Sequence, residues 1–383
     1  MTLSAYIHFP YCLQKCPYCD FASTGIARQD VPQRAYTDAV LRELQQRAPA
    51  LQHQRLSSIF FGGGTPSLWE PAELGRVLSA LRAAFGDRVE PELEVSVECN
   101  PSSLDAARAR ALSAQGVDRL SIGVQGLDPV RLRFLGRMHD RQRALEALRD
   151  ALGAVPRVSA DLIFGLPGQS PAEAVSDALT LVDLGLSHLS AYALTIEEGT
   201  QFGQLARKGR LPLAREGDVA DSLTAVAEAL SARGFEHYEV SNHARPGQRA
   251  RHNLHYWRGG AYLGLGAGAV GCLHEAVGSA RRYRNDPDPA RYMQRAGGPE
   301  REVFSEILGP QDMLREQLML GLRTLDGVEL ARAQALTGRA LSDGREAALE
   351  RALSRGDAVL EDGFLRVPRA RWLHLDSIVA DLF

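Results

Sequence analysis

The sequence predicts an α/β protein with a parallel β-sheet covered by helices. Six short runs rich in β-branched and aromatic residues recur along the first half of the chain, and longer segments with helical periodicity separate them. Such helices supply the long crossover connections that parallel strands require. The predicted strands are residues 5–9, 58–61, 93–98, 119–124, 158–164 and 188–194.

Residues at the ends of the intervening helical segments support this alternation. Ser67 and Glu70 have the spacing of a capping box, and Gly86 is typical of a helix C-terminus. Ser170 followed by Pro171 is typical of an N-cap with proline in the first turn. An open doubly wound sheet and a partial barrel share this pattern, so periodicity leaves both open. The predicted helices are residues 71–85, 104–115, 141–152 and 171–184.

The C-terminal part of the chain differs in character and predicts a separate module. Asp362-Gly363 favours a hairpin turn between strands at 357–361 and 364–367. Helices at 310–325, 328–336 and 345–353 precede it, which together suggest a winged-helix-like fold. No basic recognition helix accompanies this pattern, so DNA binding is not expected. We therefore predict an α/β unit at 1–235, a connecting segment at 236–300 and a winged-helix-like domain at 301–383.

Composition and charge exclude several classes of protein. Hydrophobic residues make up 45% of the chain and charged residues 24%, as is ordinary for a globular protein. The net charge of −3 implies no broad attraction to nucleic acid, and no apolar run approaches the roughly 20 residues that span a bilayer. Five cysteines in 383 residues are too sparse for a disulfide framework. We therefore expect reduced thiols and a cytoplasmic location.

Three closely spaced cysteines, Cys12, Cys16 and Cys19, follow the first predicted strand in a C-x3-C-x2-C arrangement. A zinc site would usually pair two C-x2-C knuckles, whereas the remaining cysteines, Cys99 and Cys272, are isolated. A [4Fe–4S] cube is normally ligated by four thiolates, so three thiolates leave one iron free. An open coordination position is typical of a reactive metal centre rather than a structural one.

This cysteine spacing, together with the glycine-rich turn GGGTP at 62–66, resembles the radical S-adenosylmethionine (SAM) family. The resemblance implies that Cys12, Cys16 and Cys19 hold a [4Fe–4S] cluster whose fourth iron takes SAM. In that family one electron from the cluster cleaves SAM to a 5′-deoxyadenosyl radical. The resemblance also favours a partial (β/α)6 barrel over an open sheet, with the chemistry at the carboxyl ends of the strands.

Further motifs narrow the resemblance to the coproporphyrinogen dehydrogenase-like branch of this family. They are GVQ at 123–125, LGR at 135–137 and DLIFGLPGQ at 161–169. Within the LGR motif, Arg137 would bind the SAM carboxylate, because a guanidinium group matches carboxylate geometry. By this resemblance the residues in contact with SAM are Tyr6, Tyr18, Phe21, Gly63, Gly64, Thr65, Glu98, Gln125, Arg137 and Asp161.

Two subgroups of this branch differ just after the third cysteine. The oxygen-independent coproporphyrinogen III dehydrogenases carry a fourth cysteine two residues further on, and a long N-terminal extension. In this chain Phe21 occupies that position, and eleven residues precede Cys12. Cys19-Asp20-Phe21 instead matches a subgroup of haem chaperones. We therefore expect a radical-SAM haem chaperone without coproporphyrinogen III oxidase activity, with the dehydrogenase, an oxidative decarboxylase, as the alternative.

A later segment, HNLHYW at 252–257, resembles an H-N-x-x-Y-W element that is associated with haem in the chaperone subgroup. Haem iron is commonly ligated by histidine and sometimes by tyrosine, so His252 and Tyr256 are the expected ligands and His255 is a reserve. A structural role in joining the C-terminal module to the barrel is the alternative. The expected partners are haem and haem-accepting proteins. Whether the chain forms a homodimer, and whether SAM is consumed, the sequence leaves open.

Overall fold

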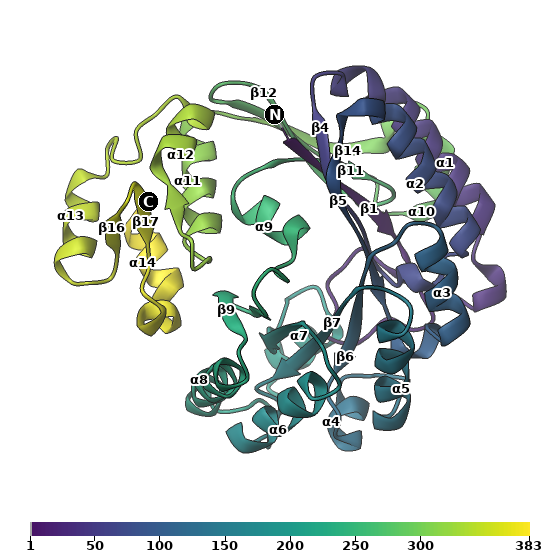
Figure 1. Ribbon diagram of the computed structural model, residues 1–383, viewed down its shortest axis with the longest axis horizontal. Coiled ribbons are helices and arrows are strands. Elements are labelled where there is room, and N and C mark those ends of the chain that lie inside the picture. Colours follow the sequence, from purple (N-terminus) through teal and green to yellow (C-terminus); the bar gives the residue numbers. More distant parts are fainter. Residues whose placement is uncertain (1) are drawn as a thin grey trace.

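The computed structural model describes residues 2–383 and contains a twelve-stranded mixed sheet that curves into an open, partial barrel (Figure 1). The strand order is β14-β13-β12-β11-β1-β4-β5-β6-β7-β8-β10-β9. Its six central strands pair in parallel and coincide with the six predicted strands apart from their exact ends. They are β1 (Thr2–Phe9), β4 (Arg55–Gly63), β5 (Val89–Cys99), β6 (Arg119–Gln125), β7 (Arg157–Phe164) and β8 (His188–Ala193).

Helices cover the outer face of this curved sheet (Figure 1). Alternate residues of a strand point to opposite faces, and outward residues such as Ile7, Phe61 and Val97 are fully buried in the largest hydrophobic core. Burying each large apolar side chain contributes about 1.5–3 kcal/mol. The covering helices include α1 (Gln33–Arg47), α2 (Pro71–Phe85), α3 (Ala106–Ala114), α5 (Arg141–Leu152), α6 (Pro171–Val182) and α8 (Glu216–Ala232).

The inner face of the same six strands is largely polar and carries a small side chain, serine, on every strand. The register sets Ser4 beside Ser58, and Ser121 beside Ser159, on neighbouring strands. Complete (β/α)8 barrels fill this space with bulky branched residues, whereas serine side chains leave room inside. Each central strand contributes one inward serine: Ser4, Ser58, Ser96, Ser121, Ser159 and Ser190.

The sheet extends beyond the six predicted strands at both edges. On one side β11 pairs in parallel with β1, and three further strands continue from it in antiparallel order. On the other side two short strands follow β8. The segment 236–300 therefore completes the sheet as well as connecting two parts of the chain. The added strands are β9 (Glu236–Glu239), β10 (Asn242–Ala244), β11 (Ala261–Leu265), β12 (Val270–Ala276), β13 (Ser279–Asn285) and β14 (Glu302–Leu308).

A buried charge network ties these added strands to α1. The fully buried carboxylate of Glu43 pairs with Arg47 at 2.7 Å and accepts hydrogen bonds from Tyr292 Oη at 2.6 Å and from the main-chain nitrogen of Gly266 at 3.0 Å. Asn285 Nδ2 also donates to it, at 2.9 Å. Removing one partner of a buried ion pair typically costs about 3–5 kcal/mol, so this network anchors the side of the sheet formed by β11 to β14.

Helix ends follow the sequence prediction in one case and contradict it in another. Ser170 and Glu173 form a capping box at the start of α6, which confirms the predicted N-cap. The predicted capping box ahead of α2 is wrong. Ser67 lies in a short 3₁₀ turn, where its hydroxyl contacts Ser103 Oγ at 2.6 Å, and the carboxylate of Glu70 binds Arg108 at 3.0 Å.

The C-terminal module packs next to α9 (Arg251–Trp257), which lies within the concave side of the sheet (Figure 1). Its three strands pair in the order β15-β17-β16, and the hairpin turn at Asp362 and Gly363 has the positive φ angles, 52° and 79°, that a type I′ turn requires. Within residues 2–383 no helix combines the length and apolarity needed to cross a bilayer. The module contains α11 (Pro310–Gly321), α12 (Leu330–Thr337), α13 (Glu346–Ser354), α14 (Leu375–Asp381), β15 (Val328–Glu329), β16 (Val359–Glu361) and β17 (Phe364–Arg366).

Candidate functional site

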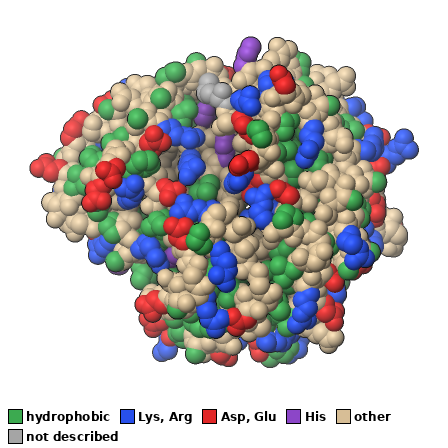
Figure 2. Space-filling model, viewed as in Figure 1, with side chains coloured by type: hydrophobic (Ala, Val, Ile, Leu, Met, Phe, Trp, Pro, Cys, Tyr) green, Lys and Arg blue, Asp and Glu red, His purple; other side chains and the backbone are tan. Residues whose placement is uncertain are grey.

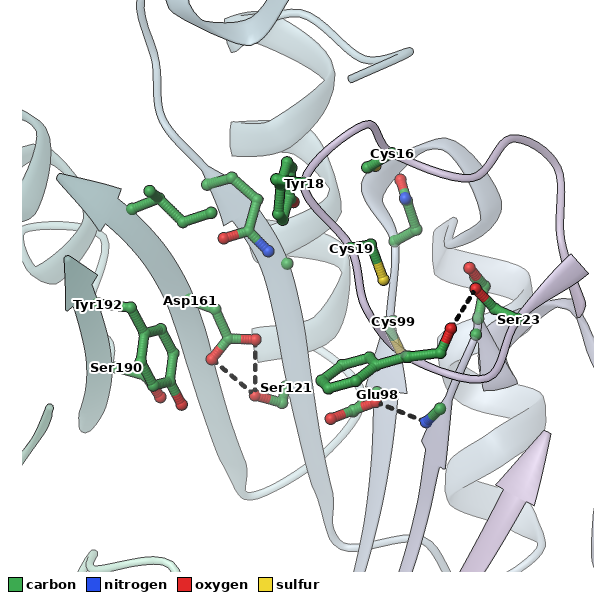
Figure 3. Close-up of a pocket in the computed structure, with 18 of the residues that line it drawn as sticks. Cys16, Tyr18, Cys19, Ser23, Glu98, Cys99, Ser121, Asp161, Ser190 and Tyr192 are labelled. Carbon is green, nitrogen blue, oxygen red and sulfur yellow. Dashed lines mark hydrogen bonds between the residues drawn. The ribbon is translucent and has the colours of Figure 1, made fainter. Parts of the chain in front are cut away.

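A cavity of about 400 Å³ occupies the mouth of the partial barrel. The loop after β1 forms one wall, and the inner faces of the central strands form the other (Figure 3). This volume is typical of small-molecule sites. The predicted site residues that line it are Cys12, Cys16, Tyr18, Cys19, Phe21, Gly63, Gly64, Thr65, Glu98, Gln125, Arg137 and Asp161.

The structure brings the three motif cysteines to one wall of this cavity. Cys12 ends the short strand β2 (Tyr11–Cys12) and accepts a hydrogen bond from Thr65 Oγ1 at 3.4 Å, while Cys16 and Cys19 lie on the loop beyond it (Figure 3). Burial raises the pKa of the Cys12 and Cys19 thiols. Within residues 2–383 no three His, Cys, Asp or Glu side chains converge on one metal ion. A cluster anchored through three separate irons does not need such convergence.

Arg137 lies beside the cysteines with hydrogen-bonding capacity to spare. Its Nη1 approaches Cys16 Sγ at 3.6 Å and its Nη2 donates to the carbonyl of Gly123 at 2.5 Å. Its buried Nε finds no acceptor among the described residues. A Cβ at Gly123 would lie 3.0 Å from Gln125 Nε2 and 3.5 Å from Arg137, so a larger residue there would disturb both side chains. This arrangement suits an anionic group held next to the three thiols.

In the glycine turn at the end of β4, the N–H groups of residues 63–65 already donate hydrogen bonds within the protein. Gly63, at φ +110°, donates to Glu98 Oε2 at 3.1 Å, and Gly64 and Thr65 donate to the carbonyls of Phe9 and Tyr11 at 2.7 and 2.9 Å. The turn therefore offers carbonyl oxygens, rather than N–H groups, to a ligand. Carbonyl oxygens beside a carboxylate suit a cationic donor such as an amino group.

Two partly buried carboxyl groups point into the cavity on either side of Ser121 (Figure 3). Asp161 accepts a hydrogen bond from Ser121 Oγ at 3.2 Å. Burial, and then repulsion by Asp161, raises the pKa of Glu98 to about 8, and burial raises that of Asp161 to about 6. Such groups can accept hydrogen bonds from ribose hydroxyls or donate one when protonated.

Gln125 has a strained backbone at the end of β6. Its φ of +69° lies in the left-handed region, which costs a non-glycine residue about 1–3 kcal/mol. The register with β7 shifts between Gly123 and Gln125, so the strand is bulged at this point. Strain of this kind is concentrated at ligand sites, and the bulge changes the direction of the Gln125 side chain in the cavity wall.

Three predicted site residues lie outside the residues that line this cavity: Tyr6, His252 and Tyr256. The hydroxyl of Tyr6 is hydrogen-bonded to His8 Nδ1 at 2.9 Å, and its ring stacks on Phe60, which does line the cavity. Sequence reasoning missed several lining residues that follow the two-residue period of the inner strand faces, and this period was the available signal. They are Arg119, Ser121, Ser159, His188, Ser190 and Tyr192.

The HNLHYW segment forms α9, and its first histidine is buried against the barrel. His252 is 1% exposed, and its ring nitrogens contact Ser58 Oγ at 2.8 Å and Tyr256 Oη at 3.2 Å. His255 differs, because within the described part of the chain only its Nε2 makes a hydrogen bond, with the carbonyl of Ala261 at 2.7 Å. Burial lowers the pKa of His255 to about 4, so the imidazole is neutral near pH 7.

Comparison with known proteins decides the family. The profile of the Radical SAM superfamily matches residues 6–181, and that of the HemN C-terminal domain matches residues 308–374. The chain is 38% identical to the heme chaperone HemW of Escherichia coli K12 over 294 residues, which are 76% of either chain. This chain belongs to the HemW family. The heme chaperone HemW of Lactococcus lactis IL1403 is 34% identical over 85% of this chain and 82% of its own.

The fold is shared more widely than the HemW sequence pattern. A solved structure of coproporphyrinogen III oxidase (HemN) from Escherichia coli superposes with a TM-score of 0.81, over 99% of this chain and 89% of that one. Sequence identity in that comparison is 21%, so it establishes the partial barrel and its C-terminal domain and nothing finer. The predicted radical SAM barrel with a C-terminal module is confirmed.

The raised pKa of Glu98 predicts a pH dependence of stability in the ligand-free HemW-family protein. Between the unfolded pKa near 4.5 and the folded pKa of about 8, the folded state holds a proton that the unfolded state has lost. The free energy of unfolding therefore falls as pH rises through this interval. From pH 6.5 to 8.5, Glu98→Gln should remove about 2 kcal/mol of this decline, measured by urea denaturation.

The control for this measurement is Glu228→Gln, at an exposed position on α8. It should keep the pH slope of the unsubstituted protein. A slope left unchanged by Glu98→Gln would show that the carboxyl is ionised throughout this range, contrary to its raised pKa.

Proposed function

We propose that this chain is a haem chaperone that holds one [4Fe–4S] cluster and SAM at the mouth of its partial barrel and delivers haem to acceptor haemoproteins. The observation that carries the proposal is the convergence of Cys12, Cys16 and Cys19 with Arg137 on a cavity of small-molecule size, in a HemW-family chain. The relatives named heme chaperone HemW supply the haem part of the proposal.

The residues of the site fit the cluster and SAM. Cys12, Cys16 and Cys19 would ligate three irons as thiolates, and metal binding would displace the protons that their burial otherwise favours. When bound, the cluster supplies a reducing electron and an open iron for the ligand. Arg137 would pair with the SAM carboxylate, and the carbonyls of Gly63 and Gly64 would accept from its amino group.

The remaining contacts would orient the rest of SAM. Glu98 and Asp161 would hold the ribose hydroxyls, because both carboxyl groups point into the cavity. Gln125 and Thr65 would add polar contacts. Tyr18, Phe21 and Tyr6 complete the proposed set, with Phe21 acting through its main chain, since its side chain is 54% exposed at the rim. Tyr6 would contribute indirectly, because its ring stacks on Phe60, which lines the cavity.

We propose that haem binds beside α9. Ligation by His252 or Tyr256 would break the hydrogen bond that joins the two side chains. His255 is better prepared for this role. Ligating imidazoles commonly donate their second N–H to a carbonyl oxygen, as Nε2 of His255 is placed to do with Ala261, and its Nδ1 has no hydrogen bond among the described residues.

We further propose a cytoplasmic location, where the five free cysteines would stay reduced. The partners would be haem and haem-accepting proteins, with no nucleic acid. Self-association into a homodimer remains part of the proposal to be tested.

Cluster binding gives a direct prediction. Anaerobic reconstitution should load about four irons and four sulfides per chain. Cys12→Ser, Cys16→Ser and Cys19→Ser should each abolish the charge-transfer absorbance, whereas Cys99→Ser and Cys272→Ser serve as matched controls and should retain it. Cys99 hydrogen-bonds the carbonyl of Val97, and Cys272 lies on β12. Loss of the cluster in the Cys99 variant alone would contradict the ligand assignment.

The dehydrogenase alternative is tested by porphyrinogen turnover. Because Phe21 provides no thiol at the position of a fourth cysteine, reconstituted protein given SAM, reductant and coproporphyrinogen III should form no protoporphyrinogen IX. Analysis of the porphyrins by liquid chromatography measures this directly. Multiple turnovers under these conditions would replace the chaperone proposal with that of an enzyme of haem synthesis.

Haem ligation by α9 is tested by single substitutions. His255→Ala should shift the Soret band or weaken haem binding most, and the cluster spectrum should remain, because α9 contributes no cysteine. His252→Ala and Tyr256→Ala test the other two candidates, and His53→Ala, at an exposed position, is the control. If all three α9 variants keep the Soret band and affinity of the unsubstituted protein, the ligand must be sought at His139, His237 or His243.

A further inference from the structure

A second cleft, of about 370 Å³, lies between the C-terminal end of α9 and the C-terminal module. Trp257 and Arg258 border it from the barrel side, and Arg332 of α12 borders it from the module. Figure 2 shows Lys and Arg side chains, with some acidic ones among them, gathered over the junction between the module and the barrel. None of the cysteine-site residues lines this cleft.

The cleft has more positive charge than its own acids neutralise. Arg332 makes no hydrogen bond or ion pair with any described residue. Among residues 2–383, Arg366 donates only to the main-chain oxygens of Asp326 and Glu361, at 3.1 and 3.3 Å. Arg258 pairs with Asp326 at 3.1 Å, but the same carboxylate also pairs with Arg249 at 2.9 Å, so one negative charge is shared by two arginines.

Burial, and then the positive charge of Arg258, lowers the pKa of Arg332. The negative charge that opposes this effect at Arg332 comes from Glu329, whose side chain is exposed. Arg332 in turn helps to lower the pKa of His255 and His274, which places it within electrostatic reach of the proposed haem ligand. Two guanidinium groups that line the same cleft are both stabilised when an anion binds there.

Next to these cations the cleft has a smaller apolar part that includes two aromatic rings. Trp257 lies on the barrel side, and Phe364 of β17 lies on the module side with the guanidinium of Arg366 4.8 Å from its ring centre. Leu325 and Val328 complete the apolar part. A ligand that carries carboxylates on the edge of a flat apolar body matches the cations and this smaller apolar part.

We propose that this cleft binds the propionate-bearing edge of haem, with Arg332 and Arg258 holding the carboxylates. This inference rests on the proposed haem-chaperone function. It assigns the orientation of the macrocycle, with its propionates toward the C-terminal module and its iron toward His255 of α9. The C-terminal module is then part of the haem site. An acidic segment of an acceptor protein would be the competing occupant of the same cations.

The test compares haemin with its dimethyl ester, in which both propionates are neutral. For the unsubstituted protein, esterification should weaken binding roughly tenfold or more, as loss of a charge-assisted contact does. Arg332→Gln should weaken binding of haemin by a similar factor, and esterification should then weaken it little further. Arg332→Lys should recover part of the loss. Arg355→Gln, an exposed arginine of the same module, is the matched control and should bind as the unsubstituted protein does.

Equal affinity of the unsubstituted protein for haemin and its ester would overturn the proposal without any variant. Haemin affinity unchanged in Arg332→Gln, with slower delivery to an acceptor, would overturn it in favour of an acidic protein segment. If the unsubstituted protein binds no haemin, the chaperone proposal fails and this inference fails with it. Binding of haemin that is indifferent to Arg332 refutes this inference alone.

Discussion

A polar barrel interior, in which every central strand carries an inward serine, is the constraint on which the rest of this protein depends. Space left inside a sheet must either be filled or carry polar groups with partners. Here Ser4 contacts Ser58 at 2.8 Å, and Ser58 contacts His252 at 2.8 Å. The polar lining thus continues into α9, and the partly buried carboxyl groups of Glu98 and Asp161 face the cavity.

This constraint explains the placement of α9. His252 stacks on Phe60 with ring centres 4.9 Å apart, and its main-chain nitrogen donates to Glu94 at 3.0 Å, so the start of the helix is fixed to the inner face of β4 and β5. The cavity with the cysteines is lined by Asn253. The C-terminal end of the same helix borders the second cleft through Trp257 and Arg258. One short, well-anchored helix therefore separates the proposed SAM and haem sites.

Features that depend on residues close together in the sequence could be predicted from the sequence. The cysteine spacing, the glycine turn at 62–66 and the ends of α2 and α5 depend on nearby residues, and all could be located from sequence. The capping box at Ser67 could not be assigned correctly, because its hydroxyl is taken by Ser103 from a distant segment. Strand β11 pairs with β1, which is far away in the sequence. Glu43 likewise accepts hydrogen bonds from Gly266 and Asn285, 223 and 242 residues further along the chain. The buried setting of His252 likewise depends on Ser58, 194 residues away.

The central claim is that this protein delivers haem to an acceptor rather than merely binding it. The most direct measurement is the rate at which haem appears in an apo-cytochrome of the b type, mixed anaerobically with the reconstituted, haem-loaded protein at increasing acceptor concentrations. Direct delivery predicts a rate that rises with acceptor concentration. A rate that is independent of acceptor concentration, and equal to that of spontaneous haem release, would contradict the chaperone function.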